Sequence, residues 1–243
     1  LLEVRNLTNS YVKDISFSLS SGEIVGLAGL MGSGRTELAR TIYGVLDMDS
    51  GEILIQGKPV NIKSPGQAIS NGIAYVSEDR KGNGVVLGLN VKENISLSVL
   101  QKLSGIFGII DKKKEEADAL ESIKKMSIKT SGVRQLVKNL SGGNQQKVSL
   151  SKSLVTSPKI LILDEPTRGV DVGAKKEIYD IINQFKKAGM AILMISSEIP
   201  EILGMSDRVM VMHEGRLTGC LEREAADQES IMRLAVGRKE VAM

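Results

Sequence analysis

A glycine-rich segment near the N-terminus has the residue types and spacing that bind anions. Residues 29–36 read GLMGSGRT and follow an apolar run over residues 24–28. The three glycines allow backbone N–H groups to converge on one anion, and a helix after the segment adds the partial positive charge of its N-terminus. The pattern predicts a phosphate-binding loop (Walker A) between a buried strand and a helix over residues 36–43, the alternative being an ordinary glycine turn.

One position departs from the phosphate-loop pattern. The lysine expected after the last glycine is replaced by Arg35, and the next residue is Thr36. Arginine keeps the positive charge, but its planar guanidinium is larger than the ammonium group that such a loop accommodates. Thr36 would place its hydroxyl on Mg²⁺. We therefore expect phosphate binding to survive and the geometry at the terminal phosphate to change.

Two adjacent carboxylates follow a second apolar run. Residues 160–163 read ILIL and lead directly into Asp164 and Glu165. The carboxyl ends of strands in open α/β sheets are where ligands bind, so Asp164 could hold Mg²⁺ with its water shell while Glu165 polarises an attacking water. The alternative is that the two acids cap the N-terminus of a helix.

A third segment lies before the acidic pair and is separated from it by a short predicted helix. Residues 140–147 read LSGGNQQK, in which Ser141 can cap a helix while the N–H groups of Gly142 and Gly143 lie at its positive end. Together with the sequence DEPT at 164–167, this segment resembles the signature of the ATP-binding cassette (ABC) family, and the resemblance covers essentially the whole chain. A capped helix without a ligand is the alternative.

The resemblance implies a ligand set and an activity. In this family the signature helix binds the γ-phosphate of an ATP held by the phosphate loop of a second domain, so that two domains enclose two nucleotides. The implied function is an ATPase with ATP and Mg²⁺ as ligands and Glu165 as the catalytic residue. Mg²⁺ is assigned to Thr36, Asp164 and Glu78. ATP is assigned to Gly29, Met31, Gly32, Ser33, Gly34, Arg35, Thr36 and Glu37, and to Ser141, Gly142, Gly143 and Gln145.

Three further segments look like the C-terminal half of ribose-type sugar-import ATPases, which carry two cassettes on one polypeptide. They are SEDRK at 77–81, GGNQQK at 142–147 and TRGVDVGAK at 167–175. This resemblance implies three partners: the N-terminal ABC half of the same polypeptide, transmembrane permease subunits and, indirectly, a periplasmic or extracellular sugar-binding protein. It also implies a peripheral location at the cytoplasmic face of the bacterial cell membrane.

Two interpretations of the chain's own site stay open. Arg35 stands for the usual Lys, Glu78 for a Gln and Ser197 for a His that contacts the γ-phosphate in the family. The chain is then either an ATP-hydrolysing half or a catalytically weak half that completes its partner's site through the signature. Tyr11 could stack on the adenine or serve only in packing.

Apolar strands that alternate with amphipathic helices predict an α/β fold with a P-loop NTPase (RecA-like) core and a mainly parallel sheet. An antiparallel β subdomain is expected at the N-terminus and an inserted α-helical subdomain in the middle. We expect one ABC nucleotide-binding domain over 1–243, with a core of 1–86 and 156–243 and a helical subdomain of 87–155. Within the latter, Leu120, Ile123 and Met126 are expected on one apolar face, behind a solvated charged run at 112–116.

Composition fits a large globular domain, since 42% of the 243 residues are hydrophobic. A net charge of +3 over 32 basic and 29 acidic residues argues against a dedicated nucleic-acid surface. The single Cys220 excludes an intramolecular disulfide and favours a reducing cytoplasm. Because no run approaches the roughly 18 apolar residues that a membrane span needs, we expect the chain not to span a membrane.

Overall fold

The structure, a computed structural model, describes residues 1–105 and 108–237, and the chain divides into two compact units. We call the first the sheet unit; it comprises Leu1–Tyr75, Lys159–Glu165 and Asn183–Met243. The second, the helical unit, comprises Val76–Pro158 and Pro166–Ile182. Each unit is described by itself below.

A small antiparallel sheet begins the sheet unit. Its strand order is β2-β1-β4-β5, and the strands are β1 (Leu2–Thr8), β2 (Ile15–Leu19), β4 (Ser50–Ile55) and β5 (Lys58–Val60). Leu2, Val4 and Leu7 of β1 are buried, while the residues between them are more exposed. The β4–β5 hairpin turns at Gln56-Gly57, both with positive φ. The predicted antiparallel N-terminal sheet is thereby confirmed.

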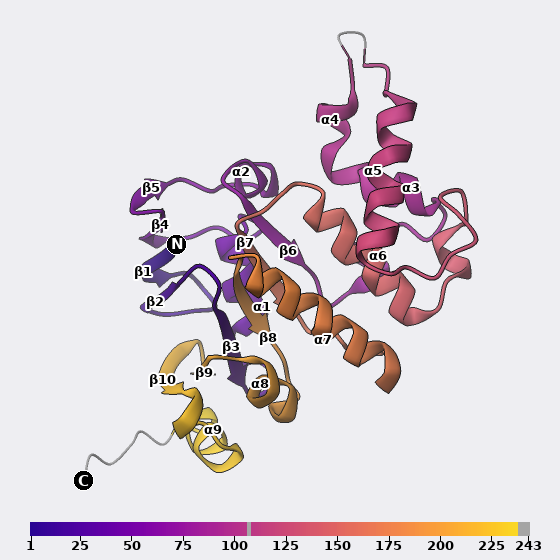
Figure 1. The fold of residues 1–243 in the computed structure, drawn as a ribbon. Helices are drawn as coiled ribbons and strands as arrows, with labels where there is room; N and C mark the ends of the chain where they lie inside the picture. Colours follow the sequence, from indigo (N-terminus) through magenta and orange to yellow (C-terminus); the bar gives the residue numbers. More distant parts are fainter. Residues whose placement is uncertain (106–107, 238–243) are drawn as a thin grey trace. The chain divides into compact units, whose positions relative to one another are not determined.

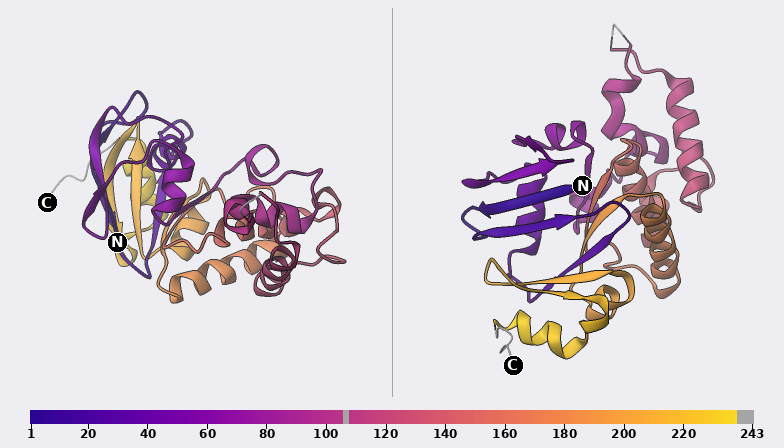
Figure 2. Two further views of the ribbon diagram at one scale, coloured as in Figure 1. Left: turned by 90° about the horizontal axis from the view of Figure 1, so that it is seen from above. Right: turned by 60° about the vertical axis from the view of Figure 1, so that its left-hand side comes forward.

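A six-stranded sheet forms the larger part of the unit (Figures 1 and 2). Its order is β10-β9-β3-β8-β7-β6, and β9, β3, β8 and β7 run parallel. β7 and β8 are buried at every position, which explains their unbroken apolar sequences. The strands are β3 (Ile24–Gly29), β6 (Ile73–Val76), β7 (Ile160–Asp164), β8 (Ala191–Ile195), β9 (Arg208–His213) and β10 (Arg216–Glu222).

One apolar core joins the two sheets to the first helix of the unit. Leu2 and Ile53 of the small sheet, Leu27 and Leu193 of the large sheet and Leu38 of α1 belong to one buried cluster. α9 packs on β9 and β10 near the C-terminal end (Figure 2). The helices are α1 (Arg35–Ile42), α2 (Pro65–Ser70), α8 (Ile199–Met205) and α9 (Gln228–Ala235), with a 3₁₀ turn, η4 (Arg223–Ala225).

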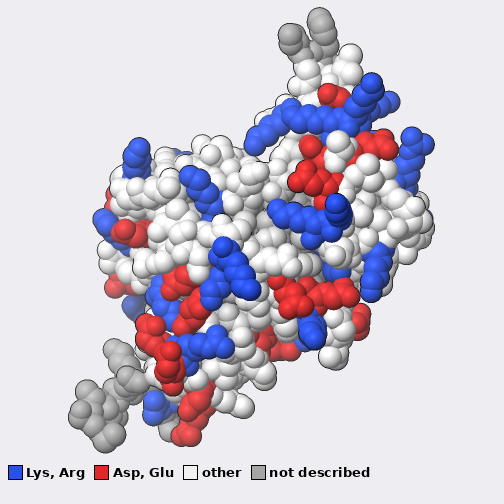
Figure 3. Space-filling view, in the orientation of Figure 1, with Lys and Arg blue, Asp and Glu red and all other residues white. Residues whose placement is uncertain are grey.

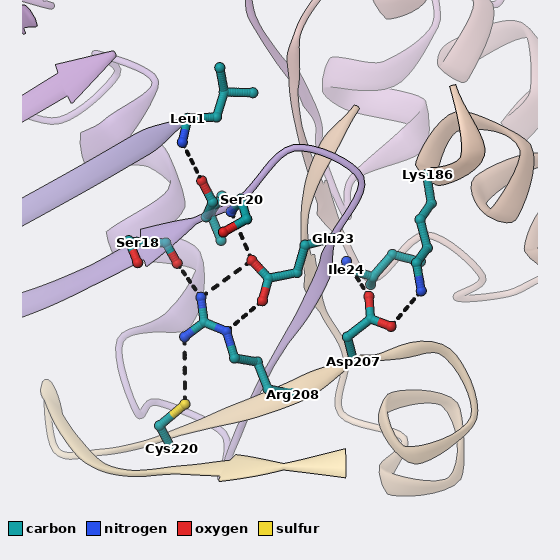
Figure 4. Close-up of polar contacts among 10 residues, drawn as sticks. Leu1, Ser18, Ser20, Glu23, Ile24, Lys186, Asp207, Arg208 and Cys220 are labelled. Atoms are coloured by element: carbon teal, nitrogen blue, oxygen red, sulfur yellow. Dashed lines mark hydrogen bonds and ion pairs between the residues drawn. The ribbon is translucent and has the colours of Figure 1, made fainter. Parts of the chain in front are cut away.

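A polar cluster fixes the amino ends of β3 and β9 (Figure 4). Glu23, just before β3, accepts a 2.6 Å hydrogen bond from Nε of Arg208 and a 2.8 Å bond from the backbone N–H of Ser20. Burial opposes ionisation of Glu23, but the bonds from Arg208 and Ser20 outweigh it and lower the pKa of that carboxyl. Lys186 and Asp207 form a second ion pair beside it. This end of the sheet is therefore held by ion pairs, leaving the carboxyl end for ligands.

The helical unit is built mainly from α3, α5 and α6, which pack together (Figure 1). Asn90 forms a capping box at the start of α3, and Asp111 accepts hydrogen bonds from two N–H groups at the start of α5. α7 also begins in this unit. Its elements are η1 (Arg80–Gly84), α3 (Val91–Ser96), η2 (Leu97–Val99), α4 (Leu100–Leu103), α5 (Lys112–Lys125), η3 (Val137–Asn139), α6 (Gly142–Leu154) and α7 (Val172–Lys187).

The buried face of α5 differs from the predicted one. Leu120 is 53% exposed, whereas Glu115, Ala119 and Met126 are buried. Residues 115, 119 and 126 recur at helical spacing, so the helix turns Leu120 away from its neighbours. Glu115 tolerates burial because it forms a 2.8 Å ion pair with Lys92 and accepts a hydrogen bond from Ser96. The prediction that Leu120 lies on the apolar face was wrong. The charged run does begin a helix with exposed lysines at 112–114, as predicted, but Glu115 is buried.

Among the helices of the described residues, none combines the length and the apolar character needed to cross a membrane.

Candidate nucleotide-binding site

The glycine-rich loop joins the carboxyl end of β3 to the first turn of α1. Gly32 and Gly34 adopt positive φ angles of 78° and 97°. A Cβ on Gly29 would lie 2.5 Å from the carbonyl oxygen of Met212, so a side chain there would not fit, and one on Gly34 would lie 3.1 Å from Val12, a tight contact. Gly34 precedes α1 without a side-chain cap, which leaves the positive end of the helix directed into the loop. Met31, at the tip, is 97% exposed.

The loop contains a buried hydroxyl with no partner among the described residues. Ser33 is 4% exposed, and its Oγ makes no hydrogen bond. A buried hydroxyl without a partner is costly, and a phosphate oxygen in the loop would accept its hydrogen bond. The loop therefore fits a phosphate group.

Thr36 and Asp164, two of the three residues predicted to bind metal, lie together in the sheet unit. The hydroxyl of Thr36 donates to Oδ1 of Asp164 at 3.2 Å, and Asp164 is fully buried at the end of β7. The hydroxyl of Tyr75, on the neighbouring strand β6, donates to Oδ2 of Asp164 at 2.8 Å. Hydroxyl and carboxylate oxygens are the hard ligands that Mg²⁺ prefers, so this pair fits the ion. Sequence reasoning missed Tyr75, whose signal is a single hydroxyl in an otherwise apolar strand.

Glu165 turns away from the strand that precedes it. Its φ of 50° is unusual for a residue with a side chain, and its N–H donates a 2.9 Å hydrogen bond to the carbonyl of Ile195. The hydroxyl of Ser197 donates to Oε2 of Glu165 at 3.2 Å. Burial raises the pKa of Glu165, and the opposing effects of the Ser197 hydrogen bond and the Arg35 charge are smaller. A carboxylate with a raised pKa is a better proton acceptor.

Arg35 crosses to the end of a neighbouring strand. Its side chain is buried, and Nη1 donates a 2.7 Å hydrogen bond to the carbonyl of Ser196, directly after β8. The guanidinium thus links the loop to the segment that carries Ser197, and its charge only partly opposes the rise that burial causes in the pKa of Glu165. Arg35 was expected to contact the phosphates, but in the structure its Nη1 donates to the carbonyl of Ser196 instead.

Tyr11 adjoins the loop. The residue is 54% exposed, and the next one, Val12, is the residue that a Cβ on Gly34 would approach. The side chain of Asn9 accepts hydrogen bonds from the N–H groups of Tyr11 and Val12, which fixes the turn. An exposed aromatic face is thereby available next to the loop.

The signature segment lies in the helical unit, where Ser141 precedes α6. Its hydroxyl accepts from the backbone N–H of Asn144 at 3.4 Å, so the predicted cap is present. A Cβ on Gly143 would lie 2.5 Å from Cβ of Ala174 on α7, which explains glycine there by helix packing. The amide of Gln145 donates to the carbonyls of Val137 and Leu140, so it supports the turn before the helix.

Glu78, the third predicted metal ligand, also belongs to the helical unit. Its Oε2 forms a 2.8 Å ion pair with Nη1 of Arg168.

On the face drawn in Figure 3, basic and acidic side chains are interspersed.

The loop, the acidic pair and the sheet order define a P-loop nucleotide-binding domain, and comparison with protein families specifies its class. The family model "ABC transporter" matches residues 12–168, and the chain belongs to this family. Two curated relatives carry the name "Ribose import ATP-binding protein RbsA": the one from Clostridium perfringens (strain 13 / Type A) is 58% identical and the one from Clostridium tetani is 56% identical. Each match covers 97% of this chain but only 47% of the relative, so the chain spans about half their length.

Solved structures support the fold. A nucleotide-free ATP-binding cassette from an ABC transporter superimposes with a TM-score of 0.83 at 20% identity, over 98% of this chain and 99% of that one. The structure of cbiO1 from Clostridium perfringens, part of the ABC transporter complex cbiONQ, gives 0.78 at 24% identity over 98% and 96%. The predicted P-loop NTPase fold is confirmed.

Proposed function

We propose that this chain is an ATP-binding and ATP-hydrolysing half of a larger protein that energises import of a ribose-like monosaccharide through a membrane permease. The observation that carries the proposal is the phosphate loop, whose buried Ser33 hydroxyl has no partner among the residues that the structure describes, in the same unit as Asp164 and Glu165. The loop supplies an anion site and the two acids supply a metal ligand and a proton acceptor.

In the proposed reaction the loop over 29–36 and the first turn of α1, including Glu37, hold the phosphates by backbone N–H groups. Thr36 and Asp164 would hold Mg²⁺, which when bound would offset the negative charge of the phosphates. Glu165 orients a water and accepts its proton as the water oxygen bonds to the γ-phosphorus and the bond to the leaving ADP breaks. Tyr11 would offer its ring to the adenine. Glu78 stays a predicted ligand of the metal, and its carboxylate forms an ion pair with Arg168 in the helical unit.

The signature acts on a second nucleotide. Ser141, Gly142 and Gly143 lie at the positive end of α6, and we propose that they contact the γ-phosphate of an ATP held by another ABC half. The length of the relatives supports a second half on the same polypeptide. The chain would be the C-terminal half and act at the cytoplasmic face of the membrane. A permease and a sugar-binding protein would be its further partners.

The expected result of Gly142→Asp in the full-length protein is loss of the ATP hydrolysis at the site that this signature completes, and so a large fall in steady-state ATP hydrolysis. A carboxylate at this position would face the γ-phosphate and repel it. Gly142→Ala is the matched control, because its Cβ would meet the carbonyl of Gly169 at 3.4 Å and Arg80 at 3.5 Å. Turnover of Gly142→Asp equal to that of Gly142→Ala would show that the signature closes no site. Copurification of the full-length protein with a membrane permease tests the transport role.

One observation favours a second candidate, a weak nucleotide-binding half that mainly completes its partner's site. The buried guanidinium of Arg35 is engaged by the carbonyl of Ser196. In this candidate Arg35 contributes little at the γ-phosphate, and turnover depends on the other half's loop. Substitution of Arg35 separates the two candidates.

A further inference from the structure

An arginine outside the predicted site lies against the signature helix. Arg80 begins η1, and this segment is fastened along α6: Nζ of Lys152 donates to the carbonyl of Asn83 at 3.0 Å, and a Cβ on Gly84 would lie 3.0 Å from Oγ of Ser149. All of these residues belong to the helical unit. The position of Arg80 next to α6 is therefore set by the fold of that unit.

The guanidinium of Arg80 is directed at the first turn of α6. Its Nη1 donates a 3.2 Å hydrogen bond to the carbonyl of Gly142, and a Cβ on Gly142 would lie 3.5 Å from its Nη2. Its Nε is buried and has no partner among the described residues. Burial lowers the pKa of Arg80 from its ordinary value. The charged group thus gives up water without full compensation by hydrogen bonds.

Within the described part of the chain, no carboxylate forms an ion pair with Arg80. Glu78, two residues earlier, is paired with Arg168 at 2.8 Å. Asp79, next to Arg80, accepts a hydrogen bond from the N–H of Gly82 at 2.9 Å. The nearest acids in the sequence are therefore engaged elsewhere.

This arrangement is unfavourable unless an anion is present. A partly buried cation without a counter-ion costs free energy, and the N-terminus of a helix carries partial positive charge that repels it. When an anion binds at the start of α6, the guanidinium and the positive end of the helix both attract it. These attractions then offset the cost of burying the cation and its repulsion by the helix end. Arginine also offers donors in a fork that suits phosphate oxygens.

We propose that Arg80 is a phosphate-binding residue of the signature, and that its guanidinium contacts the terminal phosphate of a nucleotide held by the other ABC half. The proposal rests on the proposed function of the signature and adds a side-chain cation to backbone N–H groups. It also gives a binding role to a residue of the segment at 77–81, whose sequence resembles that of ribose-type sugar-import ATPases.

The test compares Arg80→Gln with Lys81→Gln in the full-length protein. Lys81 carries the same charge one residue away and is exposed. We expect Arg80→Gln to lower kcat/KM for Mg-ATP by about 10- to 100-fold, as for loss of a hydrogen bond to a charged group, and to weaken the dependence of kcat/KM on salt. Arg80→Lys should recover part of the loss, since it keeps the charge.

Three results would overturn the proposal. Arg80→Gln could match Lys81→Gln while Gly142→Asp is inactive, in which case the signature closes a site without Arg80. Arg80→Gln could lose activity while the salt dependence stays at the wild-type slope and Arg80→Lys gives no recovery, which identifies a purely structural role. Full activity of Gly142→Asp would instead remove the proposed function on which the inference rests. Melting temperatures of all variants show whether each is folded.

Discussion

At the residue scale, the chemistry depends on a few side chains that meet at the carboxyl ends of β3, β7 and β8. Three hydrogen bonds are involved: Thr36 donates to Asp164, Ser197 donates to Glu165, and Arg35 donates to the carbonyl of Ser196. Ser197, which the family resemblance places where a histidine usually stands, donates its hydroxyl to Glu165. Arg35 connects the phosphate loop to this same segment, so its replacement should affect both phosphate binding and Glu165.

Arg35→Lys should raise ATP hydrolysis at this half's own site by about tenfold, the effect of one added hydrogen bond to a charged group. The lysine loses the bond to Ser196, and its compact ammonium can turn to the phosphates. Hydrolysis is measured in the full-length protein that carries Gly142→Asp, in which turnover at the partner's site is expected to be blocked. Arg35→Gln, which removes the charge, is the control and should show no gain. If Arg35→Lys hydrolyses no more ATP than wild type, the arginine does not limit this site.

At the element scale, the first turn of the signature helix approaches α7 closely at Gly143. Gly143→Ala would put a Cβ 2.5 Å from Cβ of Ala174, so the helices must separate. We expect a loss of about 1–3 kcal/mol in the free energy of unfolding, as for overpacking in a core. Chemical denaturation measures this loss. In the double variant Gly143→Ala, Ala174→Gly the second substitution removes the methyl group that the first one meets. The double variant should therefore lose less stability than the sum of the two single losses, and strictly additive losses would contradict the packing explanation.

The elements themselves were largely predictable from the sequence, because local patterns determine them. The glycine spacing at 29–36, the apolar runs of β7 and β8 and the cap at Ser141 each depend on neighbouring residues. The partners of the site residues were not predictable. Tyr75 meets Asp164 across 89 positions of sequence, Arg35 meets Ser196 across 161, and Glu78 meets Arg168 across 90. Such contacts follow from how strands are ordered in the sheet, which no local pattern encodes.

At the scale of the whole molecule, the two units carry different parts of the proposed nucleotide-binding sites. The sheet unit holds the phosphate loop, Asp164 and Glu165, and the helical unit holds the signature and Arg80. Family membership and the relatives' double length agree with two such halves acting on two nucleotides. The central claim is that this half has a hydrolytic site of its own, in which Glu165 accepts the proton of the attacking water.

The most direct test is ATP retention and steady-state hydrolysis by the full-length protein with Glu165→Gln. Glu224→Gln serves as the control, because it removes the charge of an exposed glutamate that is distant from Glu165 in the sequence. The account predicts that Glu165→Gln still binds Mg-ATP, retains it unhydrolysed at this half and loses the turnover that this half contributes, while Glu224→Gln behaves as wild type. Hydrolysis and retention in Glu165→Gln equal to those of wild type would contradict the account and remove Glu165 from the mechanism.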